Sequence, residues 1–250
     1  MLLIDTHCHL NSPHFAGQVG EVLARAEEAG VVELIVPGWD RASSLQALAL
    51  ATVYPGVRAA VGLHPWFVGN DSDLDWLPEL LDDARVTALG EIGIDGAIEG
   101  ADPARQEAVF RTQLQWAAAR QLPVLIHCRR GWERMLAAVR AIPGVRGVLH
   151  AFSGSGEVLR DCLALGLYIS FAGMVTRPNS LRARQAAQAV PPERLLLETD
   201  APNMALQGIP SAQAEPAHLS HVLHCVATLR GEAPEALAQQ VGENARRLFG

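Results

Sequence analysis

The chain has 250 residues, of which 49% are hydrophobic, and its formal net charge is −7. This length suffices for a large buried core, and barrels of this size are often single domains, so we expect one domain over residues 1–250. The negative charge argues against a protein that coats long nucleic acid, and no apolar run approaches the roughly 18 residues needed to cross a membrane.

The cysteine pattern bears on the cellular compartment. Four cysteines lie far apart and form no CxxC pair: Cys8, Cys128, Cys162 and Cys225. The first residues lack the basic region and long apolar stretch of a signal peptide. A reduced, cytoplasmic protein is therefore expected.

Short β-rich runs alternate with helical runs along the chain. The predicted strands cover residues 2–5, 31–37, 57–62, 86–90, 123–126, 145–149, 167–171 and 195–198. The predicted helices cover residues 19–29, 42–53, 75–83, 103–121, 133–141, 158–165, 180–190, 217–229 and 234–248. Eight such units predict an α/β fold of the TIM-type (β/α)8 barrel class. The main alternative is an open, doubly wound sheet.

Polar residues follow the C-terminal ends of most of these strands. They are His7, His9, His64, Glu91, His127, His150 and Asp200. A barrel brings all strand ends to one mouth, whereas an open sheet would separate the first strand from the last. The placement of these residues therefore favours the barrel.

The N-terminal segment Asp5-Thr6-His7-Cys8-His9 carries two of these histidines. Alternation along a strand places His7 and His9 on the same face, which makes half of a metal site. Alone, such a pair favours a metal site over a surface feature only about evenly. The metal-site interpretation is favoured once the glutamate, histidines and aspartate after the other strands are included.

Six motifs together resemble, in order, the signature blocks of one family. They are residues 4–10 (IDTHCHL), 62–65 (GLHP), 90–95 (GEIGID), 123–129 (PVLIHCR), 150–154 (HAFSG) and 196–202 (LLETDAP). The chain resembles the TatD family of metal-dependent hydrolases, which have the amidohydrolase-like barrel. Residues 200–204 (DAPNM) and the loop after them are most similar to the YjjV branch.

The resemblance implies a centre of two divalent ions, with zinc, manganese or magnesium as candidates; imidazole-rich sites favour the first two. It implies that His7, His9 and Asp200 bind one ion, that His127 and His150 bind the other, and that Glu91 bridges them. Asp200 and Glu91 are the expected catalytic residues, with Asp200 taking a proton from the attacking water. The expected substrate contacts are His64 and Arg129.

Several residues have a plainer interpretation beside the functional one. Asp5 is expected to orient a ligand rather than to bind metal. His64 precedes Pro65, so a turn-capping role competes with a substrate contact. Arg129 suits phosphate but also a surface ion pair. Among the tryptophans, Trp66 is the one considered for stacking on a nucleobase.

Three functions are compatible with these features. The first is a 3'-5' deoxyribonuclease acting on DNA ends or short single strands, or on another small phosphodiester. The second is hydrolysis of a lactone or of a D-aminoacyl-tRNA ester on the same centre, which fold and metals do not distinguish from the first. Arg129 and His64 favour a phosphate substrate. The net charge weakens that case, and so does the loop at 212–216 (AQAEP), which lacks the Asn or Arg that the TatD family often has before this proline. The third, a metal-binding protein without activity, fits the complete ligand set poorly. No membrane and no obligate protein partner are implied.

Overall fold

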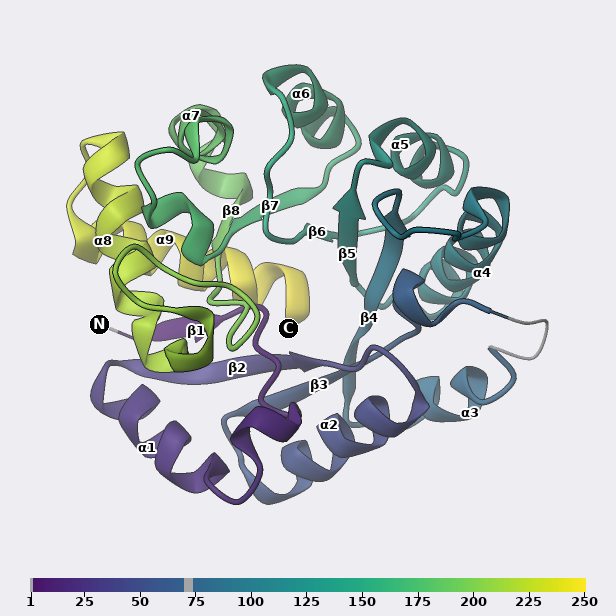
Figure 1. Ribbon diagram of the computed structural model, residues 1–250, viewed down its shortest axis with the longest axis horizontal. Coiled ribbons are helices and arrows are strands. Elements are labelled where there is room, and N and C mark those ends of the chain that lie inside the picture. The colour runs from purple at the N-terminus through teal and green to yellow at the C-terminus, as the bar shows by residue number, and fades with distance from the viewer. Residues whose placement is uncertain (1, 70–73) are drawn as a thin grey trace.

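The computed structural model describes residues 2–69 and 74–250. Eight parallel strands pair in chain order, from β1 to β8, and the helices surround them (Figure 1). The strands are β1 (Leu3–Asp5), β2 (Val31–Pro37), β3 (Val57–Val61), β4 (Val86–Asp95), β5 (Val124–Arg129), β6 (Gly147–Leu149), β7 (Tyr168–Phe171) and β8 (Leu195–Leu197). The helices are α1 (Val19–Glu28), α2 (Arg41–Val53), α3 (Leu77–Leu81), α4 (Pro103–Arg120), α5 (Trp132–Arg140), α6 (Gly156–Ala164), α7 (Leu181–Ala189), α8 (Leu219–Arg230) and α9 (Pro234–Phe249).

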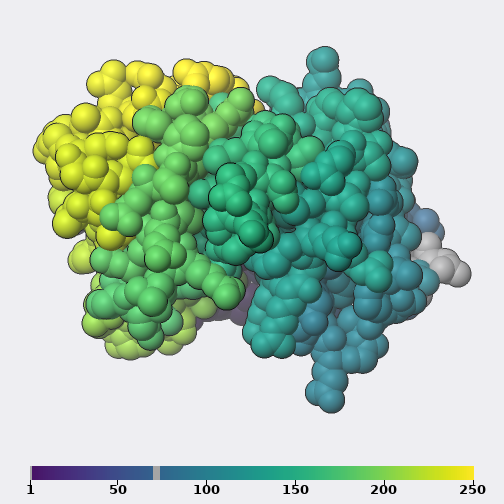
Figure 2. Space-filling view, turned by 90° about the horizontal axis from the view of Figure 1, so that it is seen from above, coloured from purple at the N-terminus to yellow at the C-terminus, as the bar shows by residue number. Residues whose placement is uncertain are grey.

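The ring closes just beyond the ends of β1 and β8. The N–H of Thr6 donates to the carbonyl of Leu197 at 3.3 Å, and the N–H of Asp200 donates to the carbonyl of His7 at 2.9 Å. In a side view the N-terminal residues are visible only at the bottom of a notch between later segments (Figure 2). The predicted TIM-type barrel is therefore confirmed, and the open sheet is excluded.

The interior of the barrel changes from apolar to polar along the strands. One buried apolar residue from each strand forms the lower layer: Ile4, Ile35, Ala60, Ala88, Leu125, Val148, Tyr168 and Leu196. Residues two positions further along share the same face of a strand. At those positions the chain carries Thr6, Pro37, Gly62, Gly90, His127, His150, Ser170 and Glu198. The upper layer is thus made of small and polar side chains and opens towards the mouth.

The C-terminal helix covers the other end of the barrel. Ala245, Leu248 and Phe249 of α9 pack with the lower apolar layer. The Arg58 guanidinium on β3 donates to the carbonyls of Phe249 and Gly250, at 2.9 and 2.6 Å. In Figure 1 the C-terminus accordingly lies near the centre of the ring. This arrangement closes the N-terminal end of the barrel with apolar side chains.

Local signals explain where several helices begin. The Asp40 side chain caps α2 by accepting from the Ser43 N–H, and the Ser43 hydroxyl oxygen accepts from the Asp40 N–H. Asp102 caps α4, with Pro103 in the first turn as predicted. Ser155 caps α6, so the Gly154-Ser155-Gly156 run serves as a helix start.

No helix within 2–69 or 74–250 is long and apolar enough to cross a membrane.

Two strands are longer than predicted. β4 continues to Asp95 instead of ending at Gly90, and β5 continues to Arg129 instead of ending at Ile126. The polar residues Glu91 and His127 therefore lie within strands, where the sequence placed them just after. Helix α3 is shorter than the predicted 75–83.

Candidate metal centre

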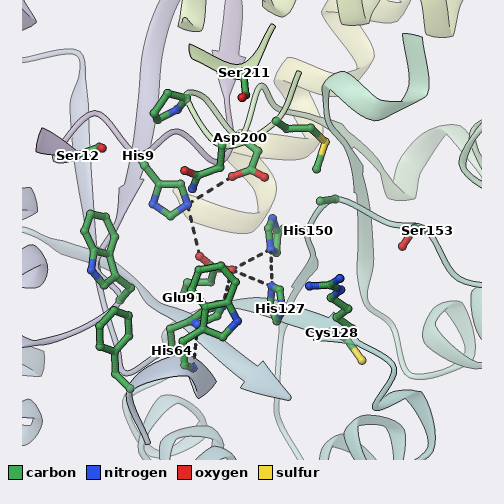
Figure 3. A pocket seen from close by; sticks show the side chains of 18 residues that line it. His9, Ser12, His64, Glu91, His127, Cys128, His150, Ser153, Asp200 and Ser211 are labelled. Atoms are coloured by element: carbon green, nitrogen blue, oxygen red, sulfur yellow. Dashed lines mark hydrogen bonds and ion pairs between the residues drawn. The ribbon is translucent and has the colours of Figure 1, made fainter. Parts of the chain in front are cut away.

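The predicted metal-binding residues converge at the C-terminal mouth of the barrel. His9, His64, Glu91, His127, His150 and Asp200 line one cavity of about 700 Å³ (Figure 3). His7 is fully buried beside them. These side chains come from β1, β3, β4, β5, β6 and β8 or the residues that follow them. The predicted convergence of scattered strand-end residues is therefore found.

Glu91 stands at the centre of the cluster. Its Oε2 lies 3.3 Å from His7 Nε2 and 3.5 Å from His9 Nε2. Its Oε1 lies 2.9 Å from His150 Nε2 and 3.2 Å from His127 Nδ1. Each carboxylate oxygen thus faces a different pair of imidazoles, and His64 Nε2 adds a third to Oε1 at 3.4 Å.

The spacing of these atoms fits a shared cation. Ligand atoms about 2.1 Å from one tetrahedral ion lie about 3.4 Å from each other. On one side the His7 Nε2–His9 Nε2 distance is 3.2 Å, which completes a triangle with Glu91 Oε2. On the other side the His127 Nδ1–His150 Nε2 distance is 3.3 Å. Two triangles of near-tetrahedral size therefore share the Glu91 carboxylate.

Asp200 adds a second carboxylate to the first triangle. Its Oδ1 is buried, has no hydrogen-bond partner, and lies 3.4 Å from His9 Nε2. Asp200 also comes within 4.8 Å of ligand atoms of His7 and His150. A buried anionic oxygen without a partner is costly unless a cation compensates it. The residues present therefore fit divalent ions.

The cluster lowers the pKa of both of its carboxyl groups. Burial opposes ionisation of Glu91, but the surrounding imidazoles, His64 and His150 foremost, outweigh it and hold its pKa well below the usual range. Burial likewise opposes ionisation of Asp200, and His9 outweighs it, so the pKa of Asp200 is lowered. Both carboxylates are thus anionic at neutral pH and ready to bind a cation.

Outer carboxylates face two of the imidazoles. Glu198 Oε1 lies 3.4 Å from His150 Nδ1 and accepts the Ala151 N–H at 2.6 Å. Asp95 Oδ2 lies 3.4 Å from His127 Nε2. Carboxylates behind ligand histidines fix the ring orientation and the tautomer. His150 then presents Nε2 to Glu91, and His127 presents Nδ1.

Asp5 has the orienting contacts that were expected. Its carboxylate accepts the Thr199 hydroxyl at 2.5 Å, the Thr199 N–H at 3.0 Å and the His7 N–H at 3.2 Å. Burial raises the pKa of Asp5 to about 7, against the opposing effect of the Thr199 hydrogen bonds. Asp5 thus ties the segment of His7 to the segment of Asp200.

His64 has the turn-capping role that the sequence left open, and it also faces Glu91. Its Nδ1 accepts the Trp66 N–H at 3.1 Å and so caps the turn that begins at Pro65. Its Nε2 points to Glu91 Oε1 at 3.4 Å. Burial lowers the pKa of His64, against the opposing effect of the Glu91 carboxylate.

Arg129 ends β5 on the rim of the cavity and is exposed. Its guanidinium forms no hydrogen bond or ion pair with any residue of the described ranges, in contrast to the surface-pair interpretation. It therefore remains available to an anion that enters the cavity.

Strand alternation predicts the His7–His9 pair only in part, because β1 already ends at Asp5. The two imidazoles meet nonetheless, since the following segment is fixed by the His9 N–H bond to the Ala201 carbonyl at 2.8 Å.

Gly93 on β4 allows two neighbouring strands to lie close together at the site. A Cβ there would overlap the His127 carbonyl, so glycine permits the close pairing that brings Glu91 to His127.

Two residues near the cluster were not singled out from the sequence. Asp95 was noted only as part of a motif, although its alternation with Glu91 and Gly93 signals the same face of β4. Trp39 follows β2, and its ring lies 5.3 Å from that of His9. An aromatic residue just beyond a strand is a weaker signal than a histidine.

Comparison with known proteins identifies the family of this chain. The TatD-related DNase family matches residues 4–250. The crystal structure of YjjV, a TatD homologue from Escherichia coli K12, has a TM-score of 0.94 at 35% identity, and the match covers 99% of this chain and 97% of that one. The 3'-5' ssDNA/RNA exonuclease TatD of Erwinia billingiae is 37% identical over 259 residues, covering 99% of this chain and 98% of the relative. An uncharacterized metal-dependent hydrolase of Bacillus subtilis, YabD, is 33% identical over 252 residues, covering 99% of each.

The match spans the six motifs and the barrel that carries them, and the likeness to YjjV agrees with the predicted branch. This chain belongs to the TatD family of metal-dependent hydrolases.

Proposed function

We propose that this chain is a divalent-metal-dependent exonuclease of the 3'-5' type, acting on DNA ends or short single strands. The observation that carries the proposal is the Glu91 carboxylate, whose two oxygens face two separate imidazole pairs. That arrangement suits two ions, and paired ions suit the displacement at a phosphodiester. Relatives named as 3'-5' ssDNA/RNA exonucleases, at about 37% identity, support the substrate class.

We assign the ligands to two ions. His7, His9 and Asp200 would hold one ion, His127 and His150 the other, and Glu91 would join the two. Two ions held here would polarise the phosphoryl group and make a water nucleophilic at neutral pH. With one carboxylate oxygen bound to an ion, Asp200 would use the other to take the proton of the attacking water and return it to the leaving oxygen.

Two side chains are proposed as substrate contacts. Arg129 on the rim is exposed, and its guanidinium has no partner within residues 2–69 and 74–250, so it can make a bidentate contact with a phosphate oxygen pair. His64 lies on the side of Glu91 where the second ion would sit, so it meets the substrate or an added ion. Both contacts are local, which agrees with a net charge of −7.

A hydrolysis screen with measured metal content tests the proposal. Wild type and Glu91→Ala are compared on 3'- and 5'-labelled single-stranded oligonucleotides, a lactone and a D-aminoacyl-tRNA. We expect metal-dependent shortening from the 3' end by wild type alone. Turnover of the lactone or the aminoacyl ester, without cleavage of any nucleic acid, would replace the proposal with the alternative hydrolase.

A salt titration tests how the nucleic acid is held. Each phosphate neutralised on a single strand contributes roughly −0.7 to the slope of log affinity against log salt. Binding of a fluorescent oligonucleotide to Asp200→Asn should give a shallow slope, on the order of −1 to −2. A slope near −5 or steeper would require an extended basic groove and contradict local recognition.

A further inference from the structure

Trp66 combines exposure with a fixed orientation. It is 61% exposed, one of the most exposed large apolar residues in the described ranges, and it lines the cavity of the metal centre. Its indole N–H nevertheless donates to Asp95 Oδ2 at 2.7 Å, and Asp95 is 1% exposed. An exposed indole that is held by a buried carboxylate is ordered without being covered.

The same carboxylate connects Trp66 to the metal centre. Asp95 Oδ2 lies 2.7 Å from the Trp66 Nε1 and 3.4 Å from the His127 Nε2, so these nitrogens are at most about 6.1 Å apart (the sum of the two). The His64 ring lies beside both residues, with its centroid 5.1 Å from that of Trp66 and 4.5 Å from that of His127. The indole is therefore within one nucleotide of the place where a scissile phosphate would bind.

The cavity lining carries aromatic side chains as well as polar ones. Trp66 and its chain neighbour Phe67 are 61% and 45% exposed and both line the cavity. Other lining residues, such as Met204 and Ser211, are aliphatic or short and polar. Aromatic side chains next to a phosphate site match a nucleotide, which carries an apolar base beside its phosphate.

We propose that Trp66 is a stacking platform for the base of the nucleotide whose phosphate is cleaved, and that Phe67 extends this platform. Stacking tolerates every base, so the enzyme would prefer unpaired strands without preferring a sequence. Asp95 acts as a positioning residue that holds the indole in place. This inference rests on the proposed function, and it adds the determinant that selects unpaired bases.

The test separates the contribution of the Trp66 ring to substrate binding from that of its indole N–H. Trp66→Ala loses both, whereas Trp66→Phe loses the N–H and keeps a ring. Leu181→Ala on α7 removes a 64% exposed apolar side chain that does not line the cavity and serves as the control. Each variant is assayed on a short oligonucleotide with an ordinary 3'-terminal base and on the same oligonucleotide with a 3'-terminal abasic residue.

For the ordinary substrate, we expect Trp66→Ala to raise KM about 10-fold or more over Trp66→Phe, the range that loss of one stacked base gives. For the abasic substrate, the two variants should agree within about 2-fold, since no base is present to stack. The metal content should be the same in Trp66→Ala and Trp66→Phe. Equal KM values for Trp66→Ala and Trp66→Phe on the ordinary substrate, or an equal loss on both substrates, would overturn the platform and leave the nuclease assignment intact. Failure of wild type to cut either oligonucleotide would instead remove the proposed function, and the platform with it.

Discussion

The two ends of the barrel use the same eight strands for opposite purposes. At the N-terminal end, one apolar residue per strand packs against Leu248 and Phe249 of α9. At the C-terminal end, the same strands carry imidazoles and carboxylates whose buried atoms include several without hydrogen-bond partners. Two residues along a strand suffice for the change, as from Leu125 to His127 or from Val148 to His150.

This difference shows which end of the barrel stabilises the folded protein and which end costs folding free energy. Buried apolar contacts at the closed end stabilise without any bound group. The open end places a buried acidic and imidazole cluster where solvation is lost, which is costly until a cation binds. Substitutions at the two ends should therefore separate activity from stability.

The largest effect is expected for Glu91→Ala at the open end. Loss of the carboxylate that faces both imidazole pairs should reduce kcat/KM by more than about 100-fold, beyond what loss of an outer partner costs. Steady-state kinetics with metal analysis on each variant checks this. Full activity with full metal content would refute the bridging role.

The counterpart at the closed end is Leu248→Ala. Leu248 is 3% exposed, so its truncation should cost about 2–5 kcal/mol of unfolding free energy. Urea denaturation measures the loss, and kcat/KM of the remaining folded protein should match wild type. An activity loss comparable to that of Glu91→Ala would show that the two ends are not separable.

Arg129→Ala sharpens the comparison within the open end. The side chain is exposed and unpartnered within the described ranges, so neither stability nor metal content should change. We expect KM to rise about 10-fold and kcat to stay within about 2-fold, because Arg129 positions substrate without touching the ions. A kcat loss as large as that of Glu91→Ala would place Arg129 in the reacting centre.

The smallest effect is expected at the Asp83–Arg85 pair, just before β4 at the closed end. Hydrogen bonds from Arg85 lower the pKa of Asp83 to about 2. A lowered folded-state pKa stabilises above the ordinary pKa, and this contribution is lost as the pH falls towards 2. Because the pair is exposed to solvent, Asp83→Asn should shift Tm by no more than about 2 °C at pH 7 and by less at pH 3. Thermal melts at both pH values test this. A larger Tm shift at pH 3 than at pH 7 would contradict the expected pH dependence of the Asp83 contribution to stability.

The sequence was sufficient for the barrel and for the members of the cluster. Strand-end residues such as His150 and Asp200 follow apolar runs, and barrel geometry then requires them to meet. The ends of β4 and β5 were not predictable by the same rule, because Glu91 and His127 are polar residues inside strands whose outer faces remain buried.

Contacts between side chains were also beyond the sequence. The division of the two Glu91 oxygens between separate imidazole pairs depends on rotamers that no spacing reveals. The link from Asp95 on β4 joins Trp66, in the turn after β3, to His127 on β5, and only their positions in space show it. His64 could be assigned two competing roles because a motif does not say which ring nitrogen faces which partner.

The central claim is that Glu91 joins two ions at the mouth of the barrel, and anomalous diffraction from crystals grown with Mn²⁺ tests it most directly. Two peaks are predicted about 3.5–4 Å apart, one towards His7 and His9 and the other towards His127 and His150, with one Glu91 oxygen on each. A single peak that leaves one imidazole pair unbound, or no peak within reach of Glu91, would contradict the claim.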